Sequence, residues 1–232
     1  MMAIVAVKHL SVTLDGHPIL RDVNFEIDEG ESVAIIGPNG SGKTVLLKSM
    51  LGILPYEGEI IWQRGVTVGY VPQKIEADRT VPLNALALLR AKAGVIGCET
   101  NEIATTIARA GLTEEILTTQ IGHLSGGQFQ RTLIAFALLG NPRVLFFDEP
   151  TASMDEPGEE QIYDLIHRFQ HEMKITPVVV SHDISFVYRY ASRVLCLNRA
   201  GVCYGPPRGV LTAETLEQLF GSRTFYEHAP HS

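Results

Sequence analysis

The sequence predicts an α/β fold with a parallel sheet, an N-terminal antiparallel β subdomain and an inserted helical subdomain. Short apolar runs, typical of strands buried on both faces, alternate with segments of helical spacing, as in 144–147, then 161–169, then 178–180. The first thirty residues carry β patterns alone, and helical spacing continues from about residue 78 to 139. Strands that alternate with helices indicate a parallel sheet, into which the long helical stretch is inserted.

The N-terminal β patterns are short and separated by the turn dipeptides Asp15-Gly16 and Glu29-Gly30. They cover Val5–Val7, Leu10–Leu14 and Val23–Ile27. A fourth run, Ser32–Ile36, is apolar enough for the centre of a sheet and ends in a glycine-rich loop. Helical spacing follows from residue 45 to 51, so the loop joins the end of a strand to the start of a helix.

The helical insertion contains three patterns, and breaks are supplied by Gly94, Gly97, Gly111 and Gly122. The patterns cover residues 83–90, 103–110 and 133–138. A last strand, 194–197, precedes a predicted hairpin turn at 198–201. We therefore expect one domain over residues 1–232, with a core of residues 1–77 and 140–232 and a helical subdomain of about 78–139.

Composition excludes several classes of protein. The 232 residues include 19 Lys and Arg and 26 Asp and Glu, a net charge of −7, and 45% are hydrophobic, so the chain is neither disordered nor a typical nucleic-acid binder. No apolar run approaches the roughly 18 residues that span a bilayer, and the N-terminus lacks the basic region of a signal peptide. We expect a cytoplasmic protein. Cys196 and Cys203 flank the predicted turn and could face each other, but in such a protein we expect reduced, packed thiols.

The glycine-rich loop has the spacing of a phosphate-binding loop. It reads Gly37-Pro38-Asn39-Gly40-Ser41-Gly42-Lys43-Thr44 and leads through Val45 into the helix. Its glycines let backbone N–H groups surround phosphate oxygens, Lys43 reaches the β- and γ-phosphates, and the Thr44 hydroxyl coordinates Mg²⁺. The alternative is a plain glycine-rich turn, which the strand before the loop and the helix after it disfavour.

Two adjacent carboxylates follow a buried strand. Asp148 and Glu149 come directly after the apolar run 144–147, and ligands of open α/β sheets lie at the carboxyl ends of the strands. We expect Asp148 to hold Mg²⁺ and Glu149 to act as the general base toward a water molecule. A solvated turn is the alternative, which the phosphate-binding loop in the same chain disfavours.

A second helix start is rich in glycine. Leu124-Ser125-Gly126-Gly127-Gln128 leads directly into a predicted helix, whose N-terminus attracts anions. Without the phosphate-binding loop, Ser125 would be interpreted as an ordinary N-cap. Two such helix starts are more than one nucleotide needs, unless two chains pair.

With these segments the chain resembles the ATP-binding subunit of ABC transporters over essentially its whole length. The segment 124–128 matches that family's signature and excludes a P-loop kinase. Gln73 matches the glutamine that contacts the Mg²⁺–water network, 152–155 looks like the D-loop, and His182 matches the histidine that contacts the γ-phosphate. Leu14 stands where the family usually has an aromatic ring on the adenine, so whether Leu14 contacts adenine is open.

The resemblance implies ATP and Mg²⁺ as ligands, Lys43, Glu149 and His182 as catalytic residues, and Thr44, Gln73 and Asp148 around Mg²⁺. It also implies a head-to-tail dimer in which each ATP lies between the phosphate-binding loop of one copy and residues Ser125, Gly126, Gly127 and Gln128 of the other. The further partners it implies are a polytopic membrane permease, with the chain on the inner face of the membrane, and indirectly a substrate-binding protein; no nucleic acid is expected.

The cargo is inferred from a narrower resemblance. The segments 68–74 with Asp78, 81–83, 194–199 and 203–207 are similar to zinc and manganese importers. Iron-chelate or cobalamin importers are the alternative, followed by a soluble ABC ATPase without a transport role and a non-catalytic scaffold. His167 and His171, and His228 and His231, are expected to be exposed rather than metal ligands.

Overall fold

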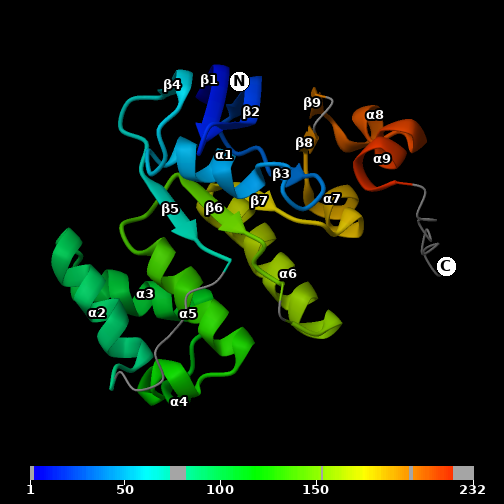
Figure 1. Ribbon diagram of the computed structural model, residues 1–232. Helices are drawn as coiled ribbons and strands as arrows, with labels where there is room; N and C mark the ends of the chain where they lie inside the picture. Colours follow the sequence, from blue (N-terminus) through cyan, green and yellow to red (C-terminus); the bar gives the residue numbers. More distant parts are fainter. Residues whose placement is uncertain (1–2, 74–81, 153, 199–200, 222–232) are drawn as a thin grey trace.

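The computed structural model describes residues 3–73, 82–152, 154–198 and 201–221, which form two sheets and the helices around them (Figure 1). The antiparallel sheet has the order β2-β1-β4, and the second sheet has the order β5-β6-β7-β3-β8-β9. All neighbours in the second sheet are parallel except β8 and β9. The strands are β1 (Ala3–Leu14), β2 (His17–Asp28), β3 (Val33–Ile36), β4 (Glu57–Trp62), β5 (Val68–Val71), β6 (Val144–Asp148), β7 (Thr176–Val180), β8 (Arg193–Asn198) and β9 (Gly201–Gly205). The predicted α/β fold with an antiparallel N-terminal sheet is confirmed.

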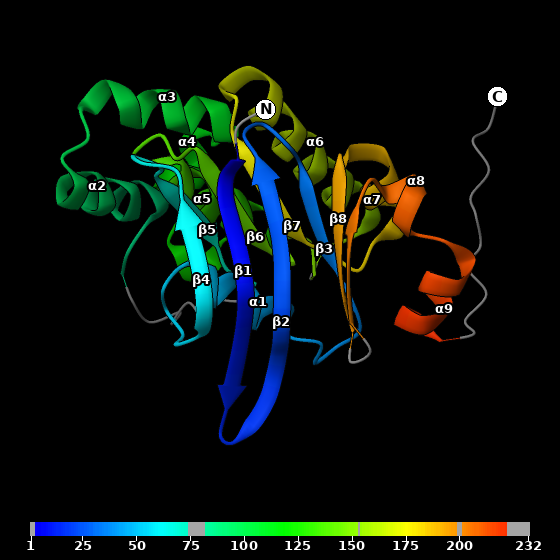
Figure 2. The ribbon, with the colours of Figure 1, turned by 90° about the horizontal axis from the view of Figure 1, so that it is seen from above.

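The N-terminal hairpin corrects one expectation. The two β patterns before residue 14 are a single strand, β1, which pairs with β2 along a long ribbon (Figure 2). The pairing shifts register between Val7 and Leu10, and His9 there has a φ of 53°. A bulge re-aims the side chains without ending the strand, so a break in the apolar pattern resembled a boundary. The turn at Asp15-Gly16 is confirmed, with φ of 50° and 77° as a two-residue hairpin loop requires.

Ten helical segments lie in the described part of the chain. They are α1 (Lys43–Met50), α2 (Ala85–Ile96), α3 (Thr100–Ala110), α4 (Glu114–Thr118), the 3₁₀ turn η1 (Ile121–His123), α5 (Gly126–Leu138), α6 (Glu156–Met173), α7 (Ile184–Tyr190), α8 (Pro207–Val210) and α9 (Ala213–Phe220). α2, α3 and α5 realise the three predicted helical patterns, and α2–α5 gather in one block beside the parallel sheet (Figure 1). The predicted breaks at Gly97 and Gly111 are confirmed, because these residues end α2 and α3 in left-handed conformations. The break predicted at Gly94 is wrong, because α2 continues through this residue. None of these helices is long and apolar enough to cross a membrane.

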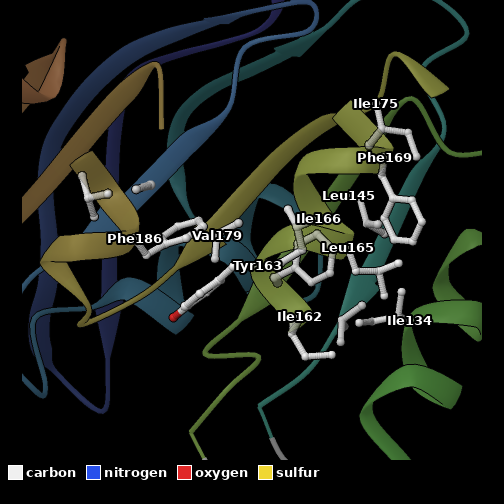
Figure 3. Close-up of a cluster of buried hydrophobic side chains, with 14 of the residues drawn as sticks. Ile134, Leu145, Ile162, Tyr163, Leu165, Ile166, Phe169, Ile175, Val179 and Phe186 are labelled. Carbon is white, nitrogen blue, oxygen red and sulfur yellow. The ribbon is translucent and has the colours of Figure 1, made fainter. Parts of the chain in front are cut away.

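The core has separate layers on the two faces of the parallel sheet. One cluster fills the space between that sheet and α6, with Leu165, Ile166 and Phe169 against strand residues such as Val179 (Figure 3). The other joins the antiparallel sheet, α1 and the opposite face, with Ile4 and Leu46 fully buried. The strands β3, β6, β7 and β8 are therefore covered on both sides, which explains their uninterrupted apolar runs.

The hairpin of β8 and β9 corrects the expectation for two cysteines. Cys196 and Cys203 lie directly opposite each other in the antiparallel pair and are joined by a disulfide. Their Cα atoms are 4.9 Å apart, within the range that a disulfide spans. The expectation of reduced thiols, drawn from the absence of an export signal, is wrong for this structure because strand pairing opposes the two residues.

Candidate nucleotide site

The carboxyl ends of three parallel strands meet at one edge of the sheet. Ile35 of β3 pairs with Val180 of β7, and Val180 pairs with Asp148 of β6. Beyond these pairs, the Ser181 N–H donates to the Ile35 carbonyl and the Glu149 N–H donates to the Val180 carbonyl, both at 3.1 Å. The glycine loop, the two carboxylates and the segment carrying His182 therefore leave the sheet side by side.

The glycine loop, residues 37–42, connects β3 to α1 and needs its glycines. A Cβ on Gly37 would lie 2.2 Å from the Leu197 carbonyl oxygen of β8, and its φ is +154°. Gly42 has a φ of +98°, and a Cβ there would lie 2.7 Å from Leu20 of β2. Gly40 also has a positive φ, and Pro38, Asn39 and Ser41 complete the loop. Neighbouring strands thus leave room only for a bare backbone, as in a loop that surrounds phosphates.

Lys43 places its ammonium inside this loop. Its Nζ donates to the carbonyls of Gly37 and Pro38 at 2.9 and 3.1 Å, and the residue is only 6% exposed. Burial lowers the pKa of Lys43, while the charges of Glu149 and Asp148 raise it. The buried hydroxyl of Ser41 has no hydrogen-bond partner among the described residues. A buried cation and an unpaired donor within a glycine loop fit a phosphate group.

Asp148 is held by hydroxyl groups on both of its oxygens. Thr44 of α1 donates to Oδ1 at 3.0 Å, and Tyr70 of β5 donates to Oδ2 at 3.3 Å. Burial raises the pKa of the Asp148 carboxyl, and the two hydrogen bonds lower it. The set of carboxylate and hydroxyl oxygens beside the glycine loop suits Mg²⁺, which prefers oxygen ligands. Val45 follows Thr44 in the first turn of α1.

Glu149 lies next to Gln73. The Gln73 amide donates from Nε2 to Oε2 of Glu149 at 2.6 Å. Glu149 has a φ of 48°, in the left-handed region that a residue with a side chain rarely adopts. Such outliers cluster at functional sites, because surrounding structure must hold them. The backbone turns here, away from the strand direction of Asp148.

The segment Ser125–Gln128 lies at the start of α5 in the helical block, apart from the glycine loop (Figure 1). Ser125 and Gln128 form a capping box: Gln128 N–H donates to the Ser125 hydroxyl at 3.3 Å, and Ser125 N–H donates to the Gln128 side chain at 2.9 Å. Gly126 and Gly127 form the first turn, and a Cβ on Gly127 would meet nothing within 4 Å. Both the N-cap interpretation and an open helix start are therefore correct.

His182 is exposed just beyond β7. It lies close to Glu159 of α6, whose pKa is raised by burial and by Asp183 and lowered by His182. Asp155, in the predicted D-loop, caps α6 by accepting from the Gly158 N–H at 3.2 Å. Ser153 of that loop lies outside the described residues, as do Lys74, Asp78, His228 and His231.

Two tyrosines of the site were not predicted. Tyr70 donates to Asp148, and its pKa is raised to about 12, first by burial. Tyr163 of α6, labelled in Figure 3, shares hydrogen bonds with Thr151 at 3.0 Å and with Ser181 at 3.3 Å, and all three residues are buried. Both tyrosines occur in apolar patterns, where the ring explains the position and nothing in the sequence reveals the hydroxyl's partner.

Leu14 is partly buried and packs against the core cluster shared by the antiparallel sheet and α1. It stands at the end of β1, opposite His17.

His167 and His171 are exposed, as expected. Among the described residues, no group of three or more His, Cys, Asp or Glu side chains is arranged to hold a metal ion.

Comparison with known proteins identifies the family. A family model described as ABC transporter matches residues 20–152. The chain is 41% identical to the zinc import ATP-binding protein ZnuC of Chromohalobacter salexigens, over 95% of this chain and 90% of that protein. It is 42% identical to the protein of the same name in Cereibacter sphaeroides, over 96% and 90% of the two chains.

Solved structures agree with this result. An inward-facing ABC transporter assigned to the metal-chelate type has a TM-score of 0.85 at 25% identity, covering 94% of this chain and 89% of that one. The ATP-binding cassette MJ0796, a dimer bound to ADP and Pi, has a TM-score of 0.73 at 28% identity, over 88% and 99% of the two chains. The chain therefore belongs to the ABC transporter family, as one of its ATP-binding proteins.

Proposed function

We propose that the chain hydrolyses ATP to power a membrane importer for divalent metal ions, zinc or manganese, and lies on the cytoplasmic face of the membrane. The observation that carries the ATPase proposal is the meeting of the glycine loop, Lys43 and the carboxylates of Asp148 and Glu149 at one sheet edge. The relatives named zinc import ATP-binding proteins support metal ions as cargo, over iron chelates or cobalamin.

Residues 37–45 would bind the ATP phosphates, with Lys43 turning its ammonium from the loop carbonyls toward the terminal phosphates. Thr44 and Asp148, with Gln73 nearby, would hold Mg²⁺, which when bound neutralises phosphate charge. The Thr44–Asp148 contact of 3.0 Å already brings these two oxygens together. Leu14 would cover the adenine ring by dispersion alone.

Glu149 would act as the general base. Its carboxylate takes a proton from the attacking water as the new O–P bond forms, and the bond from the γ-phosphorus to the ADP oxygen breaks. Lys43 stabilises the charge that develops on the phosphoryl oxygens, and His182 donates to the γ-phosphate from the next strand end. The hydrogen bond from Gln73 to Glu149 would orient the Glu149 carboxylate before the water binds.

A second copy would complete the site. The N-terminus of α5, with its glycines at 126 and 127, would face the γ-phosphate held by the partner's glycine loop. The membrane permease would contact the surface near Gln73 and the helical block, and a substrate-binding protein would act through that permease. The helical subdomain, about 78–139, would then move against the core of residues 1–77 and 140–232.

The experiment that tests the proposal is Mg-ATP hydrolysis by Glu149→Gln. Removing the base should lower the rate by about 10²–10⁴-fold while ATP binding is retained, since the amide keeps the size of the side chain. Glu59→Gln, an equivalent change on an exposed residue of β4, should hydrolyse ATP at the parent rate. Parent-like hydrolysis by Glu149→Gln would contradict the assignment of the base.

A second experiment tests the cargo. Cells that depend on this importer should lose zinc or manganese uptake with Lys43→Ala, and uptake that continues unchanged would contradict the proposed import of these ions.

A further inference from the structure

One exposed face of α6 carries a stripe of polar side chains spaced three or four residues apart. The stripe consists of Glu160, Asp164, His167 and His171. Residues at this spacing lie on the same side of a helix, one above another. The stripe takes no part in the nucleotide site described above, which lies at the carboxyl ends of β3, β6 and β7. Neither histidine is needed for the proposed hydrolysis.

The two histidines point their Nε2 atoms at each other. These atoms are 3.0 Å apart and the ring centroids 4.3 Å apart, with the ring planes inclined at 58°. One imidazole donates and the other accepts, so the two rings are joined by a hydrogen bond. Both Nε2 atoms can bind one ion once the donor ring takes the tautomer that carries its proton on Nδ1, because this frees the second lone pair.

The separation fits a shared metal ion. With metal–nitrogen bonds of about 2.0–2.1 Å, two ligands at a right angle lie about 2.9 Å apart, and two at the tetrahedral angle about 3.3 Å apart. The observed 3.0 Å lies between these values, so a shift of the two Nε2 atoms by a few tenths of an ångström gives either separation. A helix that already spaces the rings needs little reorganisation to bind.

Neighbouring side chains fix the first of the two rings. Tyr190 of α7 packs its ring edge-on against His167, with centroids 5.4 Å apart, and donates its hydroxyl to Oδ1 of Asp164 at 2.7 Å. One turn earlier, Arg189 donates to Glu160 at 2.8 Å. Contacts of this kind orient a ligand and limit the rotamer entropy lost on binding.

The exposure of the two histidines agrees with the sequence analysis, but their geometry argues against the expectation that they are no metal ligands: we propose that His167 and His171 form a chelating site for a divalent transition-metal ion of the zinc class on the surface of α6. Imidazole suits Zn²⁺, Ni²⁺ and Cu²⁺, whereas Mg²⁺ and Ca²⁺ take oxygen ligands, so the site selects against the ion expected at Asp148. The described side chains supply two ligands, and water fills the remaining positions. Such an open site exchanges its ion readily and is distinct from a structural zinc centre, which has four protein ligands.

The test is Zn²⁺ binding to the full chain in excess Mg²⁺, which occupies the oxygen sites, measured by competition with a chromophoric chelator. The background chain carries His228→Ala and His231→Ala. One Zn²⁺ per chain should bind this background, and the further change His171→Ala should weaken that binding by about 10²-fold or more, because the second ligand otherwise binds at a high effective concentration. His123→Ala, which removes an exposed histidine of η1, is the matched control and should leave the affinity unchanged.

Unchanged affinity and stoichiometry in the double variant His167→Ala, His171→Ala would overturn the proposal. Alanine has a higher helix propensity than histidine, so these exposed positions should stay folded, which circular dichroism checks. A second measurement needs no variant: in a ¹⁵N–¹H spectrum of the background chain, the Nε2 signals of two histidines should shift first during the Zn²⁺ titration. Assignment of those signals to histidines other than 167 and 171 would also overturn it. Neither outcome depends on ATP hydrolysis or on the imported ion.

Discussion

Asp148 shows how a single carboxylate is oriented by its neighbours. The residue is 2% exposed, and each of its oxygens accepts from a different hydroxyl, one on α1 and one on β5. Burial raises its pKa and the hydrogen bonds oppose that rise. Tyr70 has its own pKa raised to about 12, so its hydroxyl keeps its proton near neutral pH and acts as a donor. The carboxylate is therefore positioned before any ligand binds.

Tyr70→Phe should raise the Mg²⁺ concentration that ATP binding requires. The change removes one of the two donors that orient Asp148, and a lost hydrogen bond to a charged group is worth about 1.5–3 kcal/mol at most, so an increase of about ten-fold in the Mg²⁺ concentration at half-saturation is expected. Titration of Mg²⁺ against a fluorescent ATP analogue measures it. Tyr188→Phe, which loses a hydrogen bond to the Leu211 carbonyl far from the site, is the control. If both variants titrate like the parent, Tyr70 does not position Asp148.

At the scale of elements, one glycine brings the helical block against the sheet. A Cβ on Gly69 of β5 would lie 2.6 Å from the Ala137 carbonyl oxygen of α5 and 2.6 Å from Leu145 of β6. The backbone of α5 thus rests directly on the strand that leads to Gln73. This contact links the helical block mechanically to the candidate site.

Gly69→Ala should lower the free energy of unfolding by about 1–3 kcal/mol, because backbone atoms must move to admit the methyl group. Gly94→Ala is the matched comparison, since a Cβ there meets nothing within 4 Å in the interior of α2. It should raise stability by about 0.5–1 kcal/mol through higher helix propensity. Urea unfolding followed by circular dichroism gives both values. A Gly69→Ala protein as stable as the parent would show that α5 adjusts freely on the sheet.

Tyr163 joins α6 to the two segments that leave β6 and β7. Its ring stacks on Phe186 of α7 (Figure 3), with centroids 4.1 Å apart. Its hydroxyl contacts Thr151 and Ser181 in the interior. Burial raises its pKa. The segment before the predicted D-loop and the segment before His182 therefore share one buried hydrogen-bond partner.

Tyr163→Phe should destabilise the fold by about 1–3 kcal/mol, since two buried hydroxyls lose a partner while the ring packing is kept. Denaturant unfolding measures the change, and Tyr56→Phe, at a tyrosine that is 38% exposed, should change stability by less than about 0.5 kcal/mol. Equal stability of the two variants would mean that Thr151 and Ser181 find other partners.

For the whole molecule, the sequence was sufficient to predict the fold class, the long helical insertion and the strand–loop–helix unit around Lys43. These features depend on local periodicity and glycine placement, which a single chain displays. The bulge at His9, the disulfide between Cys196 and Cys203 and the hydroxyl partners of Tyr70 and Tyr163 were missed. Each depends on which residues of two paired strands or packed elements lie opposite each other, and register and side-chain partners are not visible in local periodicity.

The two glycine-containing helix starts illustrate the same limit. Gly42 and Gly126 stand at the starts of α1 and α5. The structure places these two helix starts in different parts of the fold, one at the sheet edge and one in the helical block (Figure 1). In the proposed dimer, the start of α5 of one copy would face the phosphate held by the glycine loop of the other. Whether both helix starts serve one nucleotide is therefore a property of the assembly.

That assembly provides the last prediction. In Glu149→Gln the ATP-bound pair should accumulate, because hydrolysis no longer separates it and a neutral amide replaces a carboxylate beside the phosphates. Sedimentation velocity should then show a shift from monomer to dimer on adding Mg-ATP. Ser125→Arg, added to this variant, places a large side chain where the partner's phosphate must fit, so the dimer should disappear while each monomer still binds ATP. Loss of the capping box costs α5 about 1 kcal/mol, so the folded fraction is checked by circular dichroism. Ala104→Arg, on an exposed face of α3 in the same block, is the control and should leave the dimer intact. A dimer that persists with Ser125→Arg would exclude the head-to-tail arrangement, and one lost equally with Ala104→Arg would show that added charge alone prevents pairing.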